Sequence, residues 1–319
     1  MTKIGIRLSL RLSMQVYRNI ENLPHFRNAV ITIGTFDGVH EGHRKIIAAM
    51  QSEAVRLNGE TLVITFHPHP RKIVQSEKPL PLINTLDERV ELLQNFGVDH
   101  LVVVPFTKDF AEQTPDQYIH DFLIEKFNPA TIIIGYDHRF GKDRLGDYRL
   151  MEAKASVHGY KLLEIPKHIL DEISVSSTKI RTAILSSDIE TANKLLGYQF
   201  FFEGTVIKGD QLGRKLGYPT ANLQYNDHDK IRLGHGVYAV YVDIKGERKR
   251  GMLSIGNRPT LVGSDERIEV NIFDFDSDIY GNTVRVTVKK FLRQQEKYNS
   301  LDELVRQLGK DKAESLSVL

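Results

Sequence analysis

The spacing of hydrophobic positions changes once along the chain, near residue 200. Before that point, short apolar runs rich in β-branched residues alternate with segments whose apolar residues recur at helical spacing. The runs predict strands at residues 29–33, 61–66, 101–104, 131–134 and 161–165, and the first two have the composition of buried strands. Strands that alternate with helices in this way indicate a parallel α/β sheet wrapped by helices.

Capping residues mark the ends of the helices between these strands. Thr85 and Glu88 form a capping box ahead of a helix, and a second helix follows Thr114, with proline at its first position. Gly59 and Gly97 stand where glycine caps end helices. Ligands of such sheets bind beyond the carboxyl ends of the strands, so we expect a site in the loops that follow them.

Beyond residue 200, apolar and polar residues alternate, which is the spacing of half-buried strands. Glycine and charged turns separate short segments and predict a small closed or nearly closed antiparallel β-barrel, with strands at 202–207, 237–244, 250–255, 268–273 and 284–292. A last helix begins at Ser300, whose partner Glu303 completes a capping box. We therefore predict two domains, residues 1–186 and 187–319, joined near residues 186–198.

The composition is that of an ordinary globular protein. The 319 residues suffice for two cores, with 41% hydrophobic and 26% charged residues. A net charge of +2 gives no bias towards nucleic acid or membranes, and no apolar run approaches the roughly 20 residues of a spanning helix. The chain has no cysteine, which excludes disulfides and thiolate metal sites and is compatible with a cytoplasmic location. Residues 1–13 lack a signal peptide's apolar core, so we expect a disordered extension there, with Met14 as an alternative start.

The loop after the first predicted strand carries two histidines and three glycines. Residues 34–43 read Gly-Thr-Phe-Asp-Gly-Val-His-Glu-Gly-His, directly ahead of a predicted helix. Free N–H groups and the helix dipole at such a turn form an anion site, and glycines let a phosphate approach the backbone. His40 and His43 are spaced to donate hydrogen bonds to the same phosphate. A glycine-rich loop with incidental histidines is the alternative, but the clustering of all five residues on one turn favours a phosphate site.

Three further segments are open to two interpretations. Residues 176–181, Ser-Ser-Thr-Lys-Ile-Arg, open a helix, and a capping serine with solvated Lys and Arg explains them by itself. The glycines between residues 204 and 217 indicate backbone that bends close to a ligand, although flexible barrel turns explain them about as well, and the Walker ending is missing. Glu269 shares one face of its strand with Asn271, where an exposed glutamate is the usual interpretation.

The run at residues 34–43 resembles the Gly-x-Phe-Asp-Gly-x-His-x-Gly-His signature of nucleotidyltransferases, in the form found in bacterial bifunctional riboflavin kinase/FAD synthetases. Ser-Ser-Thr-x-Ile-Arg at residues 176–181 and Gly-x-Pro-Thr-Ala-Asn at residues 217–222 resemble two further motifs of that family, so the resemblance covers most of the chain. It implies a Rossmann-like nucleotidyltransferase domain followed by a riboflavin kinase barrel with a C-terminal helix. It also implies phosphorylation of riboflavin to FMN with Mg²⁺ and ATP, and adenylylation of FMN to FAD with release of pyrophosphate.

The resemblance implies which residues act on the nucleotide. His40 and His43 would hold the α- and β-phosphate oxygens, while Arg181, with Ser177 and Thr178, would hold the outgoing pyrophosphate. The nucleotide- and phosphate-binding residues that we expect are Gly34, Phe36, Asp37, Gly38, Gly42, His67, Asp137, Ser177, Thr178, Gly209, Gly213 and Arg214.

In the barrel, the resemblance makes Thr220 and Asn222 the residues that hold Mg²⁺ with ATP, and Glu269 the base for the riboflavin hydroxyl. Two neutral oxygens, supplemented by phosphate and water, suit a hard cation. In the first domain, Asp37 and the loop 136–140 would shape the nucleotide pocket. The expected partners are the small molecules riboflavin, FMN and ATP, with no nucleic acid and no membrane.

Three positions depart from the family pattern: His138 replaces a more usual phenylalanine, Ser254 an asparagine and Asn271 a histidine. They affect the expected packing of flavin and adenine, not the residues assigned to chemistry.

Two other functions stay open. One is a transferase for another phosphate acceptor, with a barrel that only binds. The other is a non-catalytic flavin-binding protein with a degenerate site, against which the intact histidine pair argues.

Overall fold

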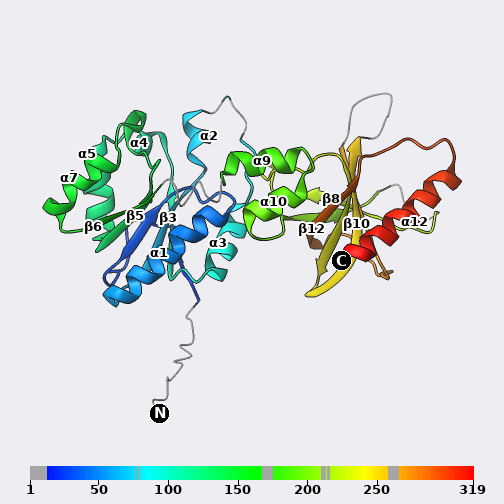
Figure 1. Cartoon of the computed structure of the whole chain (residues 1–319), viewed down its shortest axis with the longest axis horizontal. Helices are drawn as coiled ribbons and strands as arrows, with labels where there is room; N and C mark the ends of the chain where they lie inside the picture. Colours follow the sequence, from blue (N-terminus) through cyan, green and yellow to red (C-terminus); the bar gives the residue numbers. More distant parts are fainter. Residues whose placement is uncertain are drawn as a thin grey trace, which may run out of the picture. The chain divides into compact units, whose positions relative to one another are not determined.

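The computed structural model describes residues 13–75, 77, 80–166, 175–209, 213, 216–257 and 266–319. These residues form two compact units, whose elements are labelled in Figure 1. The first comprises the described residues of Met1–Leu80 and Leu86–Val175, and the second those of Pro81–Thr85 and Ser176–Leu319. Residues 81–85 and 176–186 thus belong to the second unit, whereas the predicted first domain includes them. The division of the two activities between residues 186 and 187 stays a prediction.

A six-stranded parallel sheet forms the centre of the first unit, in the order β1-β4-β3-β2-β5-β6. Its four inner strands are buried along most of their length, as a parallel sheet covered on both faces requires. The predicted α/β sheet is therefore confirmed, and β1 is an addition to it. The strands are β1 (Gln15–Tyr17), β2 (Val30–Ile33), β3 (Thr61–His67), β4 (His100–Pro105), β5 (Thr131–Gly135) and β6 (Lys161–Ile165).

The helices of the first unit begin and end close to the predicted positions. Thr114 and Gln117 form a complete capping box, after which the helix continues with π-type hydrogen bonding. At the end of the first long helix the left-handed residue is Asn58, with φ of 48°, one position before the predicted Gly59. The helices are α1 (Glu41–Leu57), α2 (Pro70–Val74), α3 (Leu86–Asn95), α4 (Lys108–Ala111), α5 (Pro115–Gln117), η1 (Tyr118–Ile124), α6 (Glu125–Phe127), η2 (Lys142–Arg144) and α7 (Tyr148–His158).

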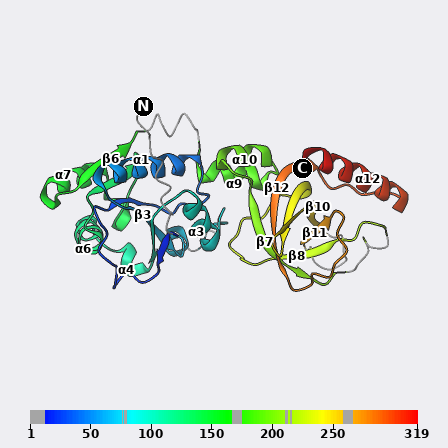
Figure 2. The ribbon, with the colours of Figure 1, turned by 90° about the horizontal axis from the view of Figure 1, so that it is seen from below.

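A closed barrel forms the centre of the second unit, with its strands in the order β10-β11-β8-β7-β12-β9. Figure 2 shows these strands curving around one another, and the C-terminal helix α12 packs against β9, β10 and β12. The antiparallel barrel and its last helix confirm the prediction, to which β8 is added. The elements are α9 (Ser177–Leu185), α10 (Ile189–Leu196), β7 (Phe201–Ile207), β8 (Ala221–Tyr225), β9 (Gly236–Ile244), β10 (Glu247–Asn257), β11 (Glu266–Ile272), β12 (Thr283–Arg293) and α12 (Leu301–Val318).

Each unit buries its own apolar core. In the first, residues of the inner strands pack with the aromatic face of η1, which includes Tyr118 and Phe122. In the second, alternate strand residues such as Val240, Leu253 and Val286 are fully buried inside the barrel. Within the described ranges, every helix is too short or too polar to cross a membrane.

Candidate active sites

The loop between β2 and α1 has an unusual backbone. Phe36, Gly38 and Val39 all lie in the left-handed region, with φ of 50°, 94° and 34°. That region is a genuine outlier for a β-branched residue such as Val39, and strained backbone of this kind clusters at functional sites. His40 then takes the N-cap position in extended conformation, and α1 begins at Glu41. The loop therefore delivers both histidines to the N-terminus of a long helix, as the sequence predicts.

The two histidine rings lie face to face. Their centroids are 3.8 Å apart with an interplanar angle of 15°, and the ring of Phe36 packs 4.7 Å from that of His43. His40 at the N-cap and His43 in the first turn of α1 are three positions apart, so their side chains lie on the same face of the helix. The predicted pair is thus brought together as a single hydrogen-bonding surface at a helix N-terminus.

His43 is neutral in this setting. Burial, followed by the nearby charges of His40 and Arg89, holds the pKa of His43 well below 6.5. Its Nδ1 is buried and has no hydrogen-bond partner among the described residues. A neutral imidazole donates one hydrogen bond and accepts one, so His43 retains hydrogen-bonding capacity for a ligand.

The other predicted residues of the first unit follow the neighbouring strands. β2 pairs with β3 on one side and with β5 on the other, so the carboxyl ends of all three meet at one edge. His67 ends β3 and is exposed, and Asp137 is exposed in the loop after β5. In that loop, burial and then the charge of Arg144 lower the pKa of His138 to about 4, and its ring packs against Phe140 with centroids 5.9 Å apart.

Of the other signature residues, Gly34 and Asp37 lie within the loop itself, and Gly42 lies at the start of α1. The N–H of Gly34 donates to the carbonyl of Ile64 at 3.0 Å, and a side chain at Gly34 would meet the ring of Phe36 at 3.3 Å. Asp37 is 1% exposed and Gly42 is buried in the first turn of α1. These residues shape the loop, which is consistent with their predicted place in the nucleotide pocket.

Ser177, Thr178 and Arg181 lie in the first two turns of α9, which is part of the second unit. Ser176 is the N-cap, and its hydroxyl accepts a hydrogen bond from the N–H of Lys179 at 3.3 Å. The Nε of Arg181 donates to the carbonyl of Pro81 at 2.8 Å within the same unit. The serine cap is therefore confirmed, whereas Arg181 is half-buried and bound to Pro81, not solvated as that interpretation expects. The contact of the motif with pyrophosphate stays a prediction.

The three predicted kinase residues meet on the barrel. Glu269 on β11 stands directly opposite Asn222 on β8, and the hydroxyl of Thr220 donates to Glu269 Oε2 at 3.2 Å. Ile268 and Val270 are buried while Glu269 is half-buried, so the predicted alternation holds. The guanidinium of Arg267 lies 3.8 Å from the other carboxylate oxygen, Oε1. A hydroxyl, an amide and a carboxylate thus come together from two strands.

The predicted glycines of the barrel pack closely on this group. A side chain at Gly209 would lie 2.0 Å from the amide nitrogen of Asn222, and one at Gly213 would lie 2.3 Å from the carbonyl of Tyr218. Gly209 therefore leaves the space that the Asn222 amide occupies. Arg214, the remaining predicted residue, lies outside the described residues.

A cavity of about 410 Å³ opens beside this group, within the second unit. Tyr218, Pro219, Asn271, Phe273 and Lys312 contribute to its lining. The amide of Asn271 donates to the carbonyl of Pro219 at 2.6 Å, and the ammonium of Lys312 lies 5.2 Å above the ring of Phe273. The volume lies in the range of small-molecule sites, although Thr220, Asn222 and Glu269 do not themselves line this cavity.

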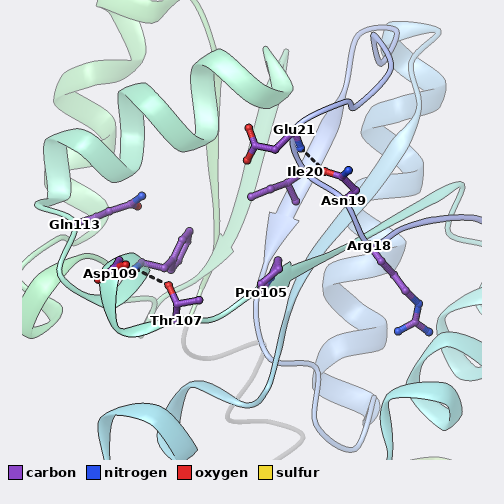
Figure 3. A pocket seen from close by; sticks show the side chains of 9 residues that line it. Arg18, Asn19, Ile20, Glu21, Pro105, Thr107, Asp109 and Gln113 are labelled. Atoms are coloured by element: carbon purple, nitrogen blue, oxygen red, sulfur yellow. Dashed lines mark hydrogen bonds between the residues drawn. The ribbon is translucent and has the colours of Figure 1, made fainter.

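A second cavity, of about 450 Å³, lies at the carboxyl ends of β1 and β4 (Figure 3). Figure 3 shows Arg18, Asn19 and Glu21 on one side and Thr107 and Asp109 on the other. The drawn hydrogen bonds cap local turns, because Asn19 Oδ1 accepts from the N–H of Glu21 and Thr107 Oγ1 accepts from that of Phe110. None of the predicted site residues lines this cavity.

Arg89 is the residue near the histidines that the sequence analysis missed. It lies on α3, is 1% exposed, and its Nη1 donates to the carbonyl of Thr35 at the start of the loop. One sequence feature could have identified it: Arg89 lies in the apolar stripe of its helix, with Leu92 and Leu93, where an aliphatic residue is expected.

Comparison with known proteins assigns each half of the chain to a family. Residues 23–179 match the family described as FAD synthetase, and residues 196–319 match that described as riboflavin kinase. The chain is 34% identical to the bifunctional riboflavin kinase/FMN adenylyltransferase of Escherichia coli (strain K12), over 93% of this chain and 96% of that protein. The chain is 36% identical to the protein of the same description in Bacillus subtilis (strain 168), over 90% of this chain and 92% of that protein. A crystal structure described as a macrolide-efflux protein from Streptococcus pneumoniae has a TM-score of 0.84 and 31% identity, covering 95% of this chain and 98% of that one.

Proposed function

The chain belongs to the family of bifunctional riboflavin kinase/FMN adenylyltransferases, and from this premise we propose which of its residues carry the two reactions. The enzyme phosphorylates riboflavin to FMN with ATP, and it transfers the adenylyl group of a second ATP to FMN to give FAD and pyrophosphate. The assignment of residues rests on the geometry of the two sites.

Adenylyl transfer takes place at the loop between β2 and α1. The FMN phosphate oxygen attacks the α-phosphorus of ATP, a new P–O bond forms, and the bond to the bridging oxygen breaks to release pyrophosphate. His40 and His43 hold the phosphate oxygens as negative charge builds on them, and the N–H groups at the start of α1 add positive electrostatic potential at the same place. The single observation that carries the assignment is the stacked histidine pair, 3.8 Å apart, at that helix N-terminus. The protein positions the reactants and stabilises charge, and no nucleophilic side chain takes part.

Phosphorylation takes place at the barrel. Glu269 accepts the proton of the riboflavin hydroxyl as that oxygen attacks the γ-phosphorus of ATP. The new P–O bond forms as the bond from the γ-phosphorus to the β–γ bridging oxygen breaks, and ADP leaves. The support is the contact of Thr220 with Glu269 at 3.2 Å and the register that sets Asn222 opposite Glu269. The oxygens of Thr220 and Asn222 fit a hard cation, and we assign them to Mg²⁺, which neutralises phosphate charge when bound. The neighbouring 410 Å³ cavity has room for a flavin ring.

The remaining assignments complete the proposal. Ser177, Thr178 and Arg181 hold the outgoing pyrophosphate, and Asp37 with the loop 136–140 shapes the nucleotide pocket. The adenylyltransferase activity is assigned to residues 1–186 and the kinase activity to residues 187–319. A cytoplasmic location, where ATP is available, is compatible with a chain that contains no cysteine.

One incubation tests the proposed function. The purified protein is mixed with riboflavin, ATP and Mg²⁺, and the flavins are separated over time. FMN is expected first and FAD after it, because the product of the barrel is the substrate of the first site. Formation of FMN without FAD would reject the adenylyl transfer, and no conversion at all would favour a binding protein. Omission of Mg²⁺ with a chelator tests the metal and is expected to stop FMN formation.

A further inference from the structure

Arg89 is a buried cation with few partners. Its side chain is 1% exposed, and it shares the inner face of α3 with Leu92 and Leu93. Isolated charges are costly to bury, so a buried arginine requires groups that accept its hydrogen bonds or balance its charge. Its Nε has no hydrogen-bond acceptor among the described residues, although it too is buried. The groups that do contact Arg89 therefore explain why an arginine is buried at this position.

Those partners all belong to the neighbourhood of the signature loop. The Nη1 of Arg89 donates to the carbonyl of Thr35 and, at 3.1 Å, to the hydroxyl of Thr65. The hydroxyl of Thr65 in turn lies 3.2 Å from the same Thr35 carbonyl, to which it donates. Two donors, one from α3 and one from β3, thus hold one carbonyl oxygen at the carboxyl end of β2.

That carbonyl stands at the start of the strained segment. The next residue, Phe36, has φ of 50°, and Val39 has φ of 34°, so the backbone turns twice into the left-handed region before it reaches His40. Such backbone persists only when its surroundings over-determine it. The hydrogen bonds to the Thr35 carbonyl hold the loop at its start, and α1 holds the loop at its end.

The charge of Arg89 reaches the catalytic groups as well. Burial lowers the pKa of Arg89, and the nearby carboxylate of Asp37, within the loop, opposes this shift. The positive charge of Arg89 contributes to the lowered pKa of His43, after burial and the charge of His40. A fixed cation behind the loop also favours negative charge on the phosphates in front of it.

We propose that Arg89 is a positioning residue for adenylyl transfer, which holds the Thr35 carbonyl and thereby fixes the loop that presents His40 and His43. The inference rests on the proposed roles of these two histidines. It goes beyond them because Arg89 acts through the loop, from a helix outside the signature.

The main test replaces Arg89 by a neutral residue of similar length. Arg89→Met is expected to lower kcat for FAD formation from FMN about 10–100-fold, because a displacement of catalytic groups by about 1 Å has effects of that size. Riboflavin phosphorylation by the same protein serves as an internal control and should be unchanged. By NMR titration, the pKa of His43 should rise in Arg89→Met, since a neighbouring positive charge is removed. The KM for ATP should change much less than kcat.

The matched control is Leu92→Ala, on the same buried face of α3, because the apolar side chain of Leu92 cannot donate a hydrogen bond to the loop. It should lower the melting temperature without lowering kcat for FAD formation in the folded protein. Equal losses of kcat in Leu92→Ala and Arg89→Met at equal stability would show that Arg89 only supports the fold and would overturn the inference. Unchanged kcat in Arg89→Met would overturn it as well.

Two further variants keep the test decisive. If Arg89→Met does not fold, Thr65→Val removes the second donor to Thr35 with little change in shape, and an unchanged kcat would then reject the inference. The double variant His43→Ala with Arg89→Met should lose less than the product of the two single losses, because part of the effect of Arg89 acts through His43 and the rest through His40. If His43→Ala keeps full activity while Arg89→Met loses it, the proposed role of His43 fails and that of Arg89 in adenylyl transfer does not.

Discussion

At the residue scale, the geometry of the histidine pair makes a direct prediction. His43→Ala removes a group that faces charge in the transition state, and loss of one such donor costs on the order of 10²–10³ in rate. FAD formation from FMN should fall by that factor, while riboflavin phosphorylation continues at the normal rate. His120→Ala, which changes an exposed histidine of the same unit, is the control. Near-normal FAD synthesis in folded His43→Ala would reject the assignment.

The kinase base gives a second residue-scale prediction. Glu269→Gln keeps the shape of the side chain and can still accept from Thr220, whose hydroxyl lies 3.2 Å from Oε2. General base catalysis is worth about 10²–10⁴, so FMN formation should slow by that order with little change in melting temperature. Glu266→Gln on the same strand is the control. If Glu269→Gln kept its kinase rate and lost flavin affinity, the carboxylate would be a binding group.

What the sequence could predict at this scale follows from distance along the chain. The two histidines and three glycines lie within ten residues, so their clustering was visible without a structure. Thr220 and Glu269 are 49 positions apart, and only the family resemblance joined them before the structure did. Arg89 lies 54 positions from Thr35 and in no motif, which is why pattern analysis assigned it no role.

At the element scale, the sequence revealed the long inner strands and missed the short or polar ones. The predicted strands became β2 to β6: the four inner ones are buried on both faces, which forces an apolar sequence, whereas β6 is a partly exposed edge strand. β1 has only three residues, and β8, Ala-Asn-Leu-Gln-Tyr, alternates apolar and polar residues over only five positions after the Pro-Thr of the kinase motif, so both are too short to give a strong pattern. Pairing with longer neighbours, β4 for the first and β7 and β11 for the second, defines these strands.

A network that joins α1 to the sheet gives a prediction at this scale. Glu53 on α1 has a side chain 8% exposed, and its carboxylate accepts hydrogen bonds from Arg56 at 2.7 Å, Lys161 at 3.1 Å and Thr131 at 3.1 Å. The Arg56 hydrogen bond is the main cause that lowers the pKa of Glu53 from 4.5 to about 2, with burial opposing it. A depressed carboxyl pKa stabilises the fold above the unfolded value and loses that stability as pH falls towards 2.

Glu53→Gln should therefore destabilise the first unit by about 2 kcal/mol at pH 7, which is less than a broken, fully buried ion pair costs because Arg56 and Lys161 are partly exposed. The difference from the unchanged protein should shrink as pH is lowered from about 4.5 towards 2. Melting curves at pH 7 and at pH 3 measure both effects. Glu125→Gln, on an exposed carboxylate, should show neither. A pH-independent loss in Glu53→Gln would mean that the shape of the site, not the charge, carries the stability.

At the scale of the whole molecule, the second unit is larger than a cut between residues 186 and 187 would leave it. It includes residues 81–85, which reach it from the first half of the sequence. The N–H of Ile231 donates to the carbonyl of Leu82 at 2.7 Å, and the hydroxyl of Tyr198 donates to Asn84 Oδ1 at 3.1 Å. The change of hydrophobic period near residue 200 located the barrel correctly, but no local pattern could indicate that five distant residues complete it.

Lys230 is a residue of the second unit whose buried charge contacts residues 81–85 directly. It is 3% exposed, its ammonium donates to the carbonyl of Ile83 at 2.7 Å, and it lies 4.7 Å from the centroid of the Phe200 ring. A fragment of residues 187–319 keeps the aromatic rings and loses the carbonyl. Loss of that carbonyl removes one hydrogen bond to a buried charged donor, at a cost of about 1–3 kcal/mol.

The last prediction combines activity and stability in that fragment. Residues 187–319, expressed alone, should fold and convert riboflavin to FMN with ATP and Mg²⁺ and should make no FAD, because Thr220, Asn222 and Glu269 all lie within them. Lys230→Met should lower the melting temperature less in the fragment, where the ammonium has lost the Ile83 carbonyl, than in the full chain, where that hydrogen bond is present. Flavin separation and melting curves on the four proteins measure this difference. An equal effect of Lys230→Met in both proteins would show that residues 81–85 do not hold this charge, and a folded fragment without kinase activity would show that the barrel takes catalytic groups from outside residues 187–319.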